Sequence, residues 1–301
     1  MTAGRVAAVD LGSNSTRLLV ADVTGGRIDE VERLLRITRL GDGVDRSGVL
    51  ADDAMGRVER VVDGYVARAR DLGVGPILAV ATSAVRDAAN GRGFLTSLAQ
   101  RHGIDGRILT GDEEAALTFR GVTSRAAPVA GTLICDVGGG STELVLGGPD
   151  GVSEQISLNI GCVRMSERHL AGDPPTADEI AGLRAATRDA LPALTQQARV
   201  LIGVAGTVTT LATIDRGLAE EIPEEIDGHR LTADAVERLL GELAALPLAA
   251  RREVRGLMPE RAPTIVAGAA ILADVLAATG LSDLTVSERD ILHGAALAAA
   301  S

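Results

Sequence analysis

The chain has 301 residues and a net charge of -11 at neutral pH, and 46% of its residues are hydrophobic. All 30 basic residues are arginines, so enzymes that need an active-site lysine, such as Walker-A nucleotide hydrolases, Schiff-base enzymes and lysine-based kinases, are excluded. The acidic balance argues against a general nucleic-acid or anionic-membrane binder, because such binding depends on a basic surface. A chain of this length can bury a large core and favours two domains.

Strands are predicted at residues 6–9, 18–23 and 28–37, and an amphipathic helix at 52–72. The segment 38–45 is a polar, glycine-rich loop that either lines a site or simply connects the elements. A strand at 77–81 leads into Thr82, Ser83 and, one turn later, Arg86. Hydroxyls and an arginine at a helix start indicate an anion site, although a helix cap beside a surface arginine is an alternative.

A strand at 106–109 is followed by a helix whose first turn carries Asp112, Glu113 and Glu114. Acidic residues in a first turn usually complement the helix dipole. A glutamate fixed at such a helix end can also act as a general base when a water lies between it and a bound phosphate. The pattern does not choose between Glu113 and Glu114.

The segment 132–148 contains two short apolar strands, 133–135 and 144–146, joined by the turn Asp136-Val-Gly-Gly-Gly-Ser-Thr-Glu143. The three glycines let the backbone turn tightly and present N–H groups to an anion. Carboxylates at both ends of such a turn suit Mg²⁺, which is bound through a few carboxylates and substrate oxygens. A glycine hairpin with solvated acids is the alternative.

The same pattern occurs twice in the chain. A shift of 126 residues aligns 9–18 with 135–144 and repeats an aspartate, a glycine, a serine, a threonine and a leucine at matching places. The repeat predicts two similar domains that each present a phosphate loop. The boundary falls in the loop 124–128, which gives predicted domains 1–125 and 126–301.

The second half contains a predicted strand at 152–158, a helix that begins with a capping box at Thr176 and runs to about residue 198, and a strand at 200–204. The strand at 200–204 is followed by Gly206 and Thr207, a further turn of the anion-binding type. Helices at 232–246 and 263–279 and a strand at 284–286 follow, with Ser287 as the predicted N-cap of a terminal helix.

Cysteines and histidines show no catalytic pattern. Cys135 and Cys162 lack CxxC spacing, which favours buried thiols in a reducing compartment over a disulfide or a zinc site, and the four histidines form no HExxH motif. The sequence has no signal-peptide pattern, and the apolar run 265–273 is too short to cross a bilayer. We therefore expect a cytoplasmic protein with neither a membrane nor a nucleic-acid partner.

Six motifs occur in a recognisable order: VAAVDLGSNSTRLLV, ATSAVRDAANG, TGDEEAALTFRGV, CDVGGGSTELVLG, NIGCVRMSERHL and GVAGTVTTLA. With them the chain resembles the Ppx/GppA phosphatase family, which comprises exopolyphosphatases and guanosine pentaphosphate phosphohydrolases, from about residue 6 to about residue 291. The resemblance implies an α/β fold of two actin-like (ribonuclease H-like, ASKHA) domains with the active site in the cleft between them.

The resemblance also implies roles for individual residues. Glu114 matches the general base, and Asp10, Asp136 and Glu143 match acids associated with Mg²⁺ or Mn²⁺. The implied phosphate-binding residues are Ser13, Asn14, Ser15, Arg86, Gly138, Gly139, Gly140, Ser141, Gly206 and Thr207.

The chain departs from the long members of the family at its C-terminus. It lacks their C-terminal HD-type domain, and its ending VSERDILHG differs from VSxxxLREG, so that Leu292 and His293 replace an arginine and a glutamate. This ending resembles short actinobacterial-type exopolyphosphatases.

We expect hydrolysis of the terminal phosphoanhydride of inorganic polyphosphate. Three alternatives remain: the same chemistry on guanosine pentaphosphate (pppGpp), a non-catalytic sensor of polyphosphate or (p)ppGpp, and a sugar kinase of the same fold. Only three aromatic residues, Tyr65, Phe94 and Phe119, are available to stack on a guanine, which favours polyphosphate. The oligomeric state stays open, with a homodimer as one option.

Overall fold

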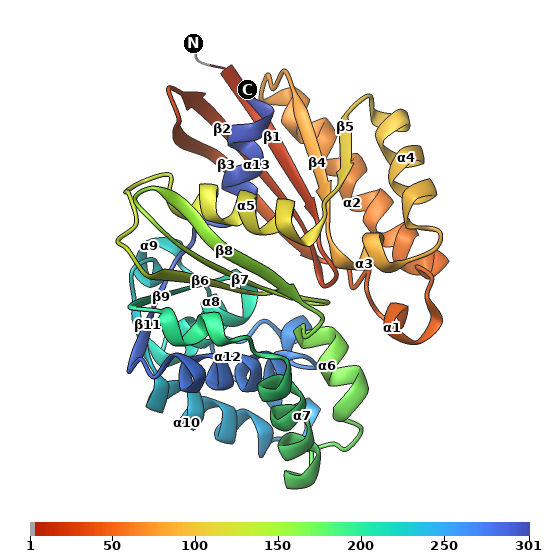
Figure 1. Ribbon diagram of the computed structural model, residues 1–301. Coiled ribbons are helices and arrows are strands. Elements are labelled where there is room, and N and C mark those ends of the chain that lie inside the picture. The colour runs from red at the N-terminus through yellow and green to blue at the C-terminus, as the bar shows by residue number, and fades with distance from the viewer. Residues whose placement is uncertain (1–3) are drawn as a thin grey trace. The chain divides into compact units, whose positions relative to one another are not determined.

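The computed structural model describes residues 4–301, with the side chain of residue 196 left out. The chain divides into two compact units (Figure 1). Unit 1 contains the described residues up to Ala127 together with Arg289–Ser301, and unit 2 is Pro128–Glu288. The predicted division into 1–125 and 126–301 differs from this at the C-terminus, because the last helix, α13 (Ile291–Ala299), packs on strands of unit 1.

Unit 1 is built on a mixed five-stranded sheet with the order β3-β2-β1-β4-β5. The first three strands form an antiparallel meander, whereas β4 is parallel to β1 and β5 is parallel to β4. The strands are β1 (Gly4–Leu11), β2 (Ser15–Thr24), β3 (Arg27–Ile37), β4 (Ile77–Ala81) and β5 (Asp105–Ile108).

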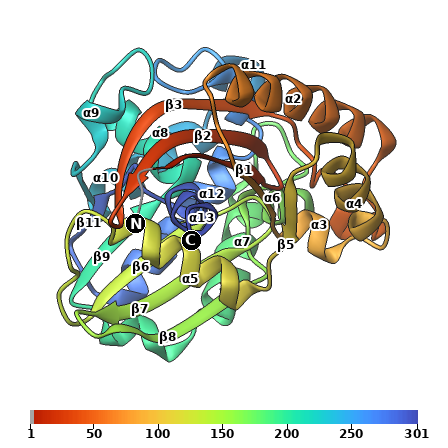
Figure 2. The ribbon, with the colours of Figure 1, turned by 90° about the horizontal axis from the view of Figure 1, so that it is seen from above.

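Helices cover both faces of this sheet. Ala7 and Val9 of β1 lie in a core cluster with residues of α2 and α4, whereas Val6 and Ala8 lie in a second cluster with α13. This alternation follows from the two-residue period of a strand and explains why β1 is apolar on both sides. Figure 2 shows α13 alongside β1 and β2. The helices are α1 (Val44–Ser47), α2 (Asp52–Asp71), α3 (Ser83–Asp87), α4 (Gly91–His102), α5 (Gly111–Val122) and α13.

Unit 2 repeats this plan with a six-stranded sheet of order β10-β11-β9-β6-β7-β8. Strands β6, β7 and β8 again form an antiparallel meander, and β9 is parallel to both β6 and β11. The strands are β6 (Thr132–Val137), β7 (Thr142–Gly148), β8 (Gly151–Leu158), β9 (Val200–Val204), β10 (Arg230–Thr232) and β11 (Asp283–Val286).

One aliphatic core holds unit 2 together. It is centred on α12, which is buried along nearly its whole length, as its uniformly apolar sequence predicts, and which packs beside α10 (Figure 1). The helices are α6 (Cys162–His169), α7 (Ala177–Ala190), α8 (Ala205–Asp215), α9 (Pro223–Ile226), α10 (Ala233–Ala244), α11 (Leu248–Arg251) and α12 (Ile265–Thr279), with 3-10 turns η1 (Ala193–Gln197) and η2 (Pro259–Arg261).

Two predicted helix boundaries were wrong. The helix that starts at the Thr176 capping box ends at Ala190 rather than near residue 198, and Pro192, which has no N–H to continue the helix, lies at the break. The terminal helix is capped by Asp290 and not by Ser287, because residues 287–290 run in an irregular segment before the helix begins.

The internal repeat is confirmed by the backbone. The N–H of Gly12 donates to the carbonyl of Ser15, and the N–H of Gly138 donates to the carbonyl of Ser141, both over 3.0 Å. Both turns join the first two strands of a three-stranded meander that is followed by parallel strands. The two mixed α/β sheets therefore have the predicted actin-like fold. Within residues 4–301 no helix is long and apolar enough to cross a membrane.

Candidate functional site

The turn between β1 and β2 is held from outside by the glycine-rich segment that follows β3. The N–H of Gly41 donates to the carbonyl of Ser13 over 2.7 Å, and the N–H groups of Thr38 and Arg39 donate to the carbonyl of Asn14 over 3.0 and 2.9 Å. A Cβ at position 41 would lie only 2.8 Å from the Cβ of Ser13, so this close approach requires glycine. The segment is therefore a support for the turn and not a plain connector.

Four polar residues of unit 1 form two contact pairs that the short helix α3 (Ser83–Asp87) joins. The hydroxyls of Ser13 and Ser83 lie 2.9 Å apart and are both buried. Ser83 begins α3, and Arg86 at the other end of this short helix donates to the carbonyl of Leu109 over 3.0 Å and to Oε2 of Glu114 over 3.1 Å. The hydroxyls, the arginine and the glutamate thus occupy one region of unit 1.

The two candidate glutamates of α5 have different environments. Glu113 forms a capping box with Thr110, whose backbone N–H and hydroxyl lower the pKa of Glu113 below its ordinary value. Glu114 is buried and ion-paired with Arg86. Glu113 is thus held at the start of the helix by Thr110, whereas Glu114 lies beside Arg86.

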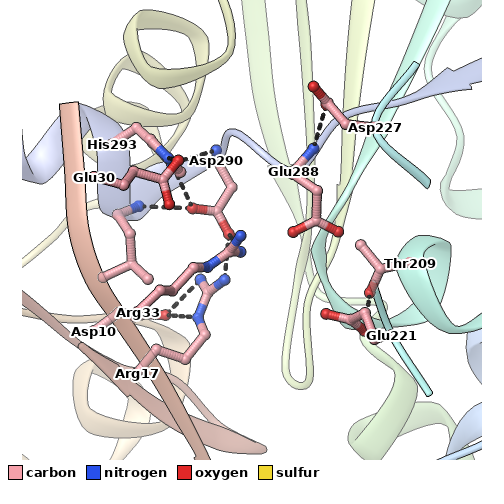
Figure 3. A network of polar contacts seen from close by, with 12 residues as sticks. Asp10, Arg17, Glu30, Arg33, Thr209, Glu221, Asp227, Glu288, Asp290 and His293 are labelled. Atoms are coloured by element: carbon pink, nitrogen blue, oxygen red, sulfur yellow. Dashed lines mark hydrogen bonds and ion pairs between the residues drawn. The ribbon is translucent and has the colours of Figure 1, made fainter. Parts of the chain in front are cut away.

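Asp10, at the end of β1, faces Arg17 across the β1–β2 pair. Arg17 donates to Oδ2 of Asp10 from Nε over 2.9 Å and from Nη2 over 2.7 Å (Figure 3). The other oxygen, Oδ1, is buried and has no hydrogen-bond partner among the described residues. Burial raises the pKa of Asp10, and Arg17 opposes this effect.

Arg17 also contacts the C-terminal segment. Its Nη1 pairs with Oδ2 of Asp290, which is 1% exposed and N-caps α13 by accepting from the N–H of Leu292 over 3.0 Å (Figure 3). His293 lies one turn further on, with Nε2 3.0 Å from Oε1 of Glu30 and Nδ1 3.2 Å from the amide nitrogen of Asp290. Although burial raises the pKa of Asp290, Arg17 and His293 hold it well below the ordinary value.

The equivalent turn of unit 2 is held by the start of α6. The N–H groups of Cys162 and Val163 donate to the carbonyls of Gly138 and Gly139 over 2.9 and 2.8 Å. The guanidinium of Arg164 donates from Nε to the carbonyl of Gly140 over 2.7 Å. The carbonyls of the glycine turn thus accept from α6, in the same way that the carbonyls of residues 13 and 14 accept from residues 38–41.

Asp136 and Glu143 are direct cross-strand partners on β6 and β7. Both are buried, and Oε1 of Glu143 accepts from the hydroxyl of Ser157 over 2.7 Å. Like charges directly opposite each other destabilise a sheet, and a cation between them relieves the repulsion. Burial, together with Asp136 and Glu143, also raises the pKa of the neighbouring Cys135 thiol, which fits an inert buried cysteine.

Each unit has its own candidate cation ligands. No group of three or more His, Cys, Asp or Glu side chains that could hold a metal ion occurs among residues 4–301. The buried pair Asp136 and Glu143 of unit 2 nevertheless matches the way Mg²⁺ is bound, because this ion keeps several waters and substrate oxygens and needs only one or two carboxylates. In unit 1 the candidate ligand atom is the unsatisfied Oδ1 of Asp10.

The third predicted turn follows β9. Ala205 has φ 69°, in the left-handed region, and Gly206 is covered by Arg261, whose Nη1 donates to the carbonyl of Gly206 and to the hydroxyl of Thr210, each over 2.6 Å. Arg261 also pairs with Glu221 over 3.3 Å. The thiol of Cys162, at the start of α6, lies near the side chains of Thr264 and Thr207, so α6 lies close to the turn 205–207 within unit 2.

Each unit thus gathers its own predicted residues. Unit 1 contains Asp10, the turn 13–15, Arg86 and Glu114, and unit 2 contains Asp136, the turn 138–141, Glu143, Gly206 and Thr207. Sequence reasoning missed Arg17, Ser157 and Arg261, which contact these residues, and Asp290, which contacts Arg17. The signal was weak because the partners of Ser157, Arg261 and Asp290 lie 14, 55 and 273 positions away, and Arg17 meets Asp10 only through the pairing of β1 with β2.

Comparison with known proteins gives consistent matches. A model of the Ppx/GppA phosphatase family matches residues 19–299. Exopolyphosphatase 2 of Mycobacterium tuberculosis is 37% identical over an alignment that covers 100% of both chains. An exopolyphosphatase-like protein of known structure has a TM-score of 0.93 at 34% identity, with 99% of this chain and 98% of that chain covered. The PPX-GPPA enzyme of Aquifex aeolicus has a TM-score of 0.85 at 30% identity, with 99% and 100% covered.

Proposed function

The chain belongs to the Ppx/GppA phosphatase family, and on this premise we propose that it is an exopolyphosphatase, which hydrolyses the terminal phosphoanhydride bond of inorganic polyphosphate and releases orthophosphate. The full-length similarity to a protein named exopolyphosphatase 2 supports this activity. The observation that carries the proposal within this chain is that the short helix α3 joins two polar pairs, the buried Ser13 and Ser83 hydroxyls near its start and the Arg86–Glu114 ion pair near its end.

Phosphate binding is assigned to the supported turns. In unit 1 these are Ser13, Asn14 and Ser15 with Arg86, and in unit 2 they are Gly138 to Ser141 with Gly206 and Thr207. Backbone N–H groups of glycine turns bind anions well, and an arginine adds charge-assisted hydrogen bonds. Because the whole chain is acidic, these local donors must supply the attraction for a polyanion.

Glu114 is the proposed general base. Its carboxylate would accept a proton from a water molecule whose oxygen attacks the terminal phosphorus, while the bond from that phosphorus to the bridging oxygen breaks. The electron pair of this bond stays on the bridging oxygen, so the products are orthophosphate and a chain one phosphate shorter. Phosphoryl transfer of this kind depends mainly on positioning and on charge neutralisation.

Asp136 and Glu143 would hold Mg²⁺ or Mn²⁺ in unit 2, and Asp10 is the proposed cation ligand of unit 1. When bound, the cation neutralises charge that develops on the phosphate oxygens. Ser157 would orient Glu143 through its hydrogen bond, and Arg17 would orient Asp10.

The test compares Glu114→Gln with Glu113→Gln. We expect Glu114→Gln to lower kcat by about 10² or more, the scale of general-base loss, with KM for polyphosphate changed little. Glu113→Gln is the matched control on the same helical turn, and we expect it to keep turnover because Glu113 only caps the helix. Near-normal kcat in Glu114→Gln would remove this residue from the mechanism.

Guanosine pentaphosphate is the main alternative substrate. Tyr65, Phe94 and Phe119 are all buried in the core of unit 1 or beside it, so none of the three aromatic residues is exposed for guanine stacking. We expect faster phosphate release from polyphosphate than from pppGpp at equal concentration in the presence of Mg²⁺. Faster release from pppGpp would reverse the assignment, and tight binding of either compound without release would indicate a sensor.

A further inference from the structure

We propose that Asp290 is a positioning residue for the site of unit 1: it holds Arg17 so that the guanidinium engages a single oxygen of Asp10 and leaves the other oxygen for a divalent cation. The inference rests on the proposed function, since it takes Asp10 as a cation ligand. It adds a role for the C-terminal segment of unit 1, Arg289–Ser301.

The geometry of Arg17 is the first step. Both Nε and Nη2 converge on Oδ2 of Asp10, and Nη1 on the far side of the guanidinium pairs with Asp290 (Figure 3). The plane of the guanidinium is therefore fixed by two carboxylates. An arginine with one carboxylate partner usually binds both of its oxygens in a fork, so the second partner accounts for the one-sided contact seen here.

The state of Asp10 is the second step. Its side chain is 4% exposed, and Oδ1 is a buried acceptor with no hydrogen-bond partner in the described part of the chain. Leaving a buried acceptor unsatisfied is costly, so such an atom at a phosphate turn points to a ligand that completes it. A Cβ at Gly12 would lie 3.7 Å from the other oxygen of Asp10, which places the carboxylate directly at this turn.

The anchoring of Asp290 is the third step. Its Oδ1 caps α13, and its backbone N–H contacts His293, which reaches Glu30 on β3. Arg33 of β3 lies 3.7 Å from Oδ2 of Asp290. Besides Arg17, three groups contact this carboxylate, which is 1% exposed: the N–H of Leu292, Arg33, and Nδ1 of His293 at 3.5 Å. Asp290 is therefore a firmly held counter-charge for Arg17. Without it, the positive charge of Arg17 would act on Asp10 alone and compete with a bound cation.

The decisive variant is Asp290→Asn. Asparagine is as good an N-cap as aspartate, so this change keeps the start of α13 and removes the negative charge that Arg17, Arg33 and His293 face. We expect the Mn²⁺ affinity of the substrate-free protein, measured by titration calorimetry, to fall by about 10-fold or more, the range found for loss of a residue that orients a metal ligand. The Mg²⁺ concentration for half-maximal phosphate release should rise in parallel, with KM for polyphosphate changed less.

Two further variants separate positioning from folding. Asp22→Asn breaks the Arg5–Asp22 pair, a half-exposed arginine–aspartate pair of the same β1–β2 hairpin, and should leave the metal response unchanged. Arg17→Gln removes the group through which Asp290 is proposed to act. Adding Asp290→Asn to Arg17→Gln should therefore change the Mn²⁺ affinity no further.

The outcomes are distinct. A folded Asp290→Asn protein with the Mn²⁺ affinity of the unmodified chain would overturn the inference, as would an undiminished effect of Asp290→Asn in the Arg17→Gln background. If Asp10→Asn leaves Mn²⁺ binding unchanged, Asp10 is not a cation ligand and the inference also fails. If the unmodified protein releases no phosphate from polyphosphate, the proposed function fails. The Mn²⁺ affinities of the unmodified protein and of Asp290→Asn, compared by calorimetry, still test the role of Asp290.

Discussion

Replacing Gly161 by alanine should displace the turn of unit 2 that is proposed to bind phosphate. Gly161 is the N-cap residue of α6, with φ -119°, a conformation open to any residue, so the effect is steric alone. A Cβ there would lie 2.3 Å from the carbonyl oxygen of Gly139 and 2.5 Å from the carbonyl carbon of Gly140. Ordinary contacts begin near ~3.5 Å, so the turn or the helix must move by roughly 1 Å.

This shift has two expected consequences. Overpacking of this kind costs about 1–3 kcal/mol of unfolding free energy. A displacement of about 1 Å in a substrate-positioning group can lower the rate by about 10²-fold. Gly161→Ala should therefore show a lower urea midpoint and a phosphate-release rate reduced by one to two orders of magnitude, well beyond what partial unfolding at 25 °C explains.

The matched control is Gly241→Ala. Gly241 is exposed in α10 of the same unit, and a Cβ there meets nothing within 4 Å. Alanine favours a helix over glycine by about 1 kcal/mol, so this variant should be slightly stabilised and fully active. Unchanged activity and stability in Gly161→Ala would refute the idea that α6 supports the turn 138–140 by direct contact.

Two other predictions concern the C-terminal helix. Gly294→Ala would place a Cβ 2.0 Å from the carbonyl oxygen of Leu117 on α5. We therefore expect urea titrations to show a loss of about 1–3 kcal/mol of unfolding free energy. An unaltered urea midpoint would show that α13 does not pack so closely on α5. Burial lowers the pKa of His293, but Asp290 and Glu30 outweigh this effect and raise the pKa. The attraction of the protonated imidazole to these two carboxylates therefore stabilises the fold fully below pH about 6.5, and this stabilisation is lost as the pH rises through the raised pKa. Between pH 6 and pH 9 the unmodified protein should lose more unfolding free energy than His293→Gln, and equal losses would contradict the assignment.

Local sequence patterns determined much of the fold. Apolar runs with two-residue alternation predicted most strands, and the three-to-four-residue spacing predicted α2, which runs from Asp52 to Asp71. The repeated aspartate, glycine and serine predicted two equivalent turns, and both form the same backbone hydrogen bond. These features follow from short-range backbone geometry, which a stretch of ten to twenty residues specifies by itself.

The two glutamates of α5 show what a local sequence pattern does not determine. Glu113 and Glu114 are equivalent as acids in the first turn of a helix, and the resemblance to a family was needed to favour Glu114. The fold separates them because Glu113 turns back to Thr110, whereas Glu114 meets Arg86, a residue 28 positions earlier in the chain. A cap is a local interaction, but an ion pair with a distant helix is set by packing.

The sequence by itself determined the position of each turn and the residues that form it, and it predicts an anion as the ligand. Only the tertiary structure decided what holds these turns in place. Residues 38–41 and α6 donate hydrogen bonds to the carbonyls of the two glycine turns, and Arg261 donates to the carbonyl of Gly206. Asp290 pairs with Arg17, which lies 273 positions earlier in the chain. The tertiary structure also assigned Arg289–Ser301 to unit 1 instead of the predicted C-terminal domain. The physical reason is that a charge or a close contact from a distant segment leaves no periodic trace near the residue that it positions.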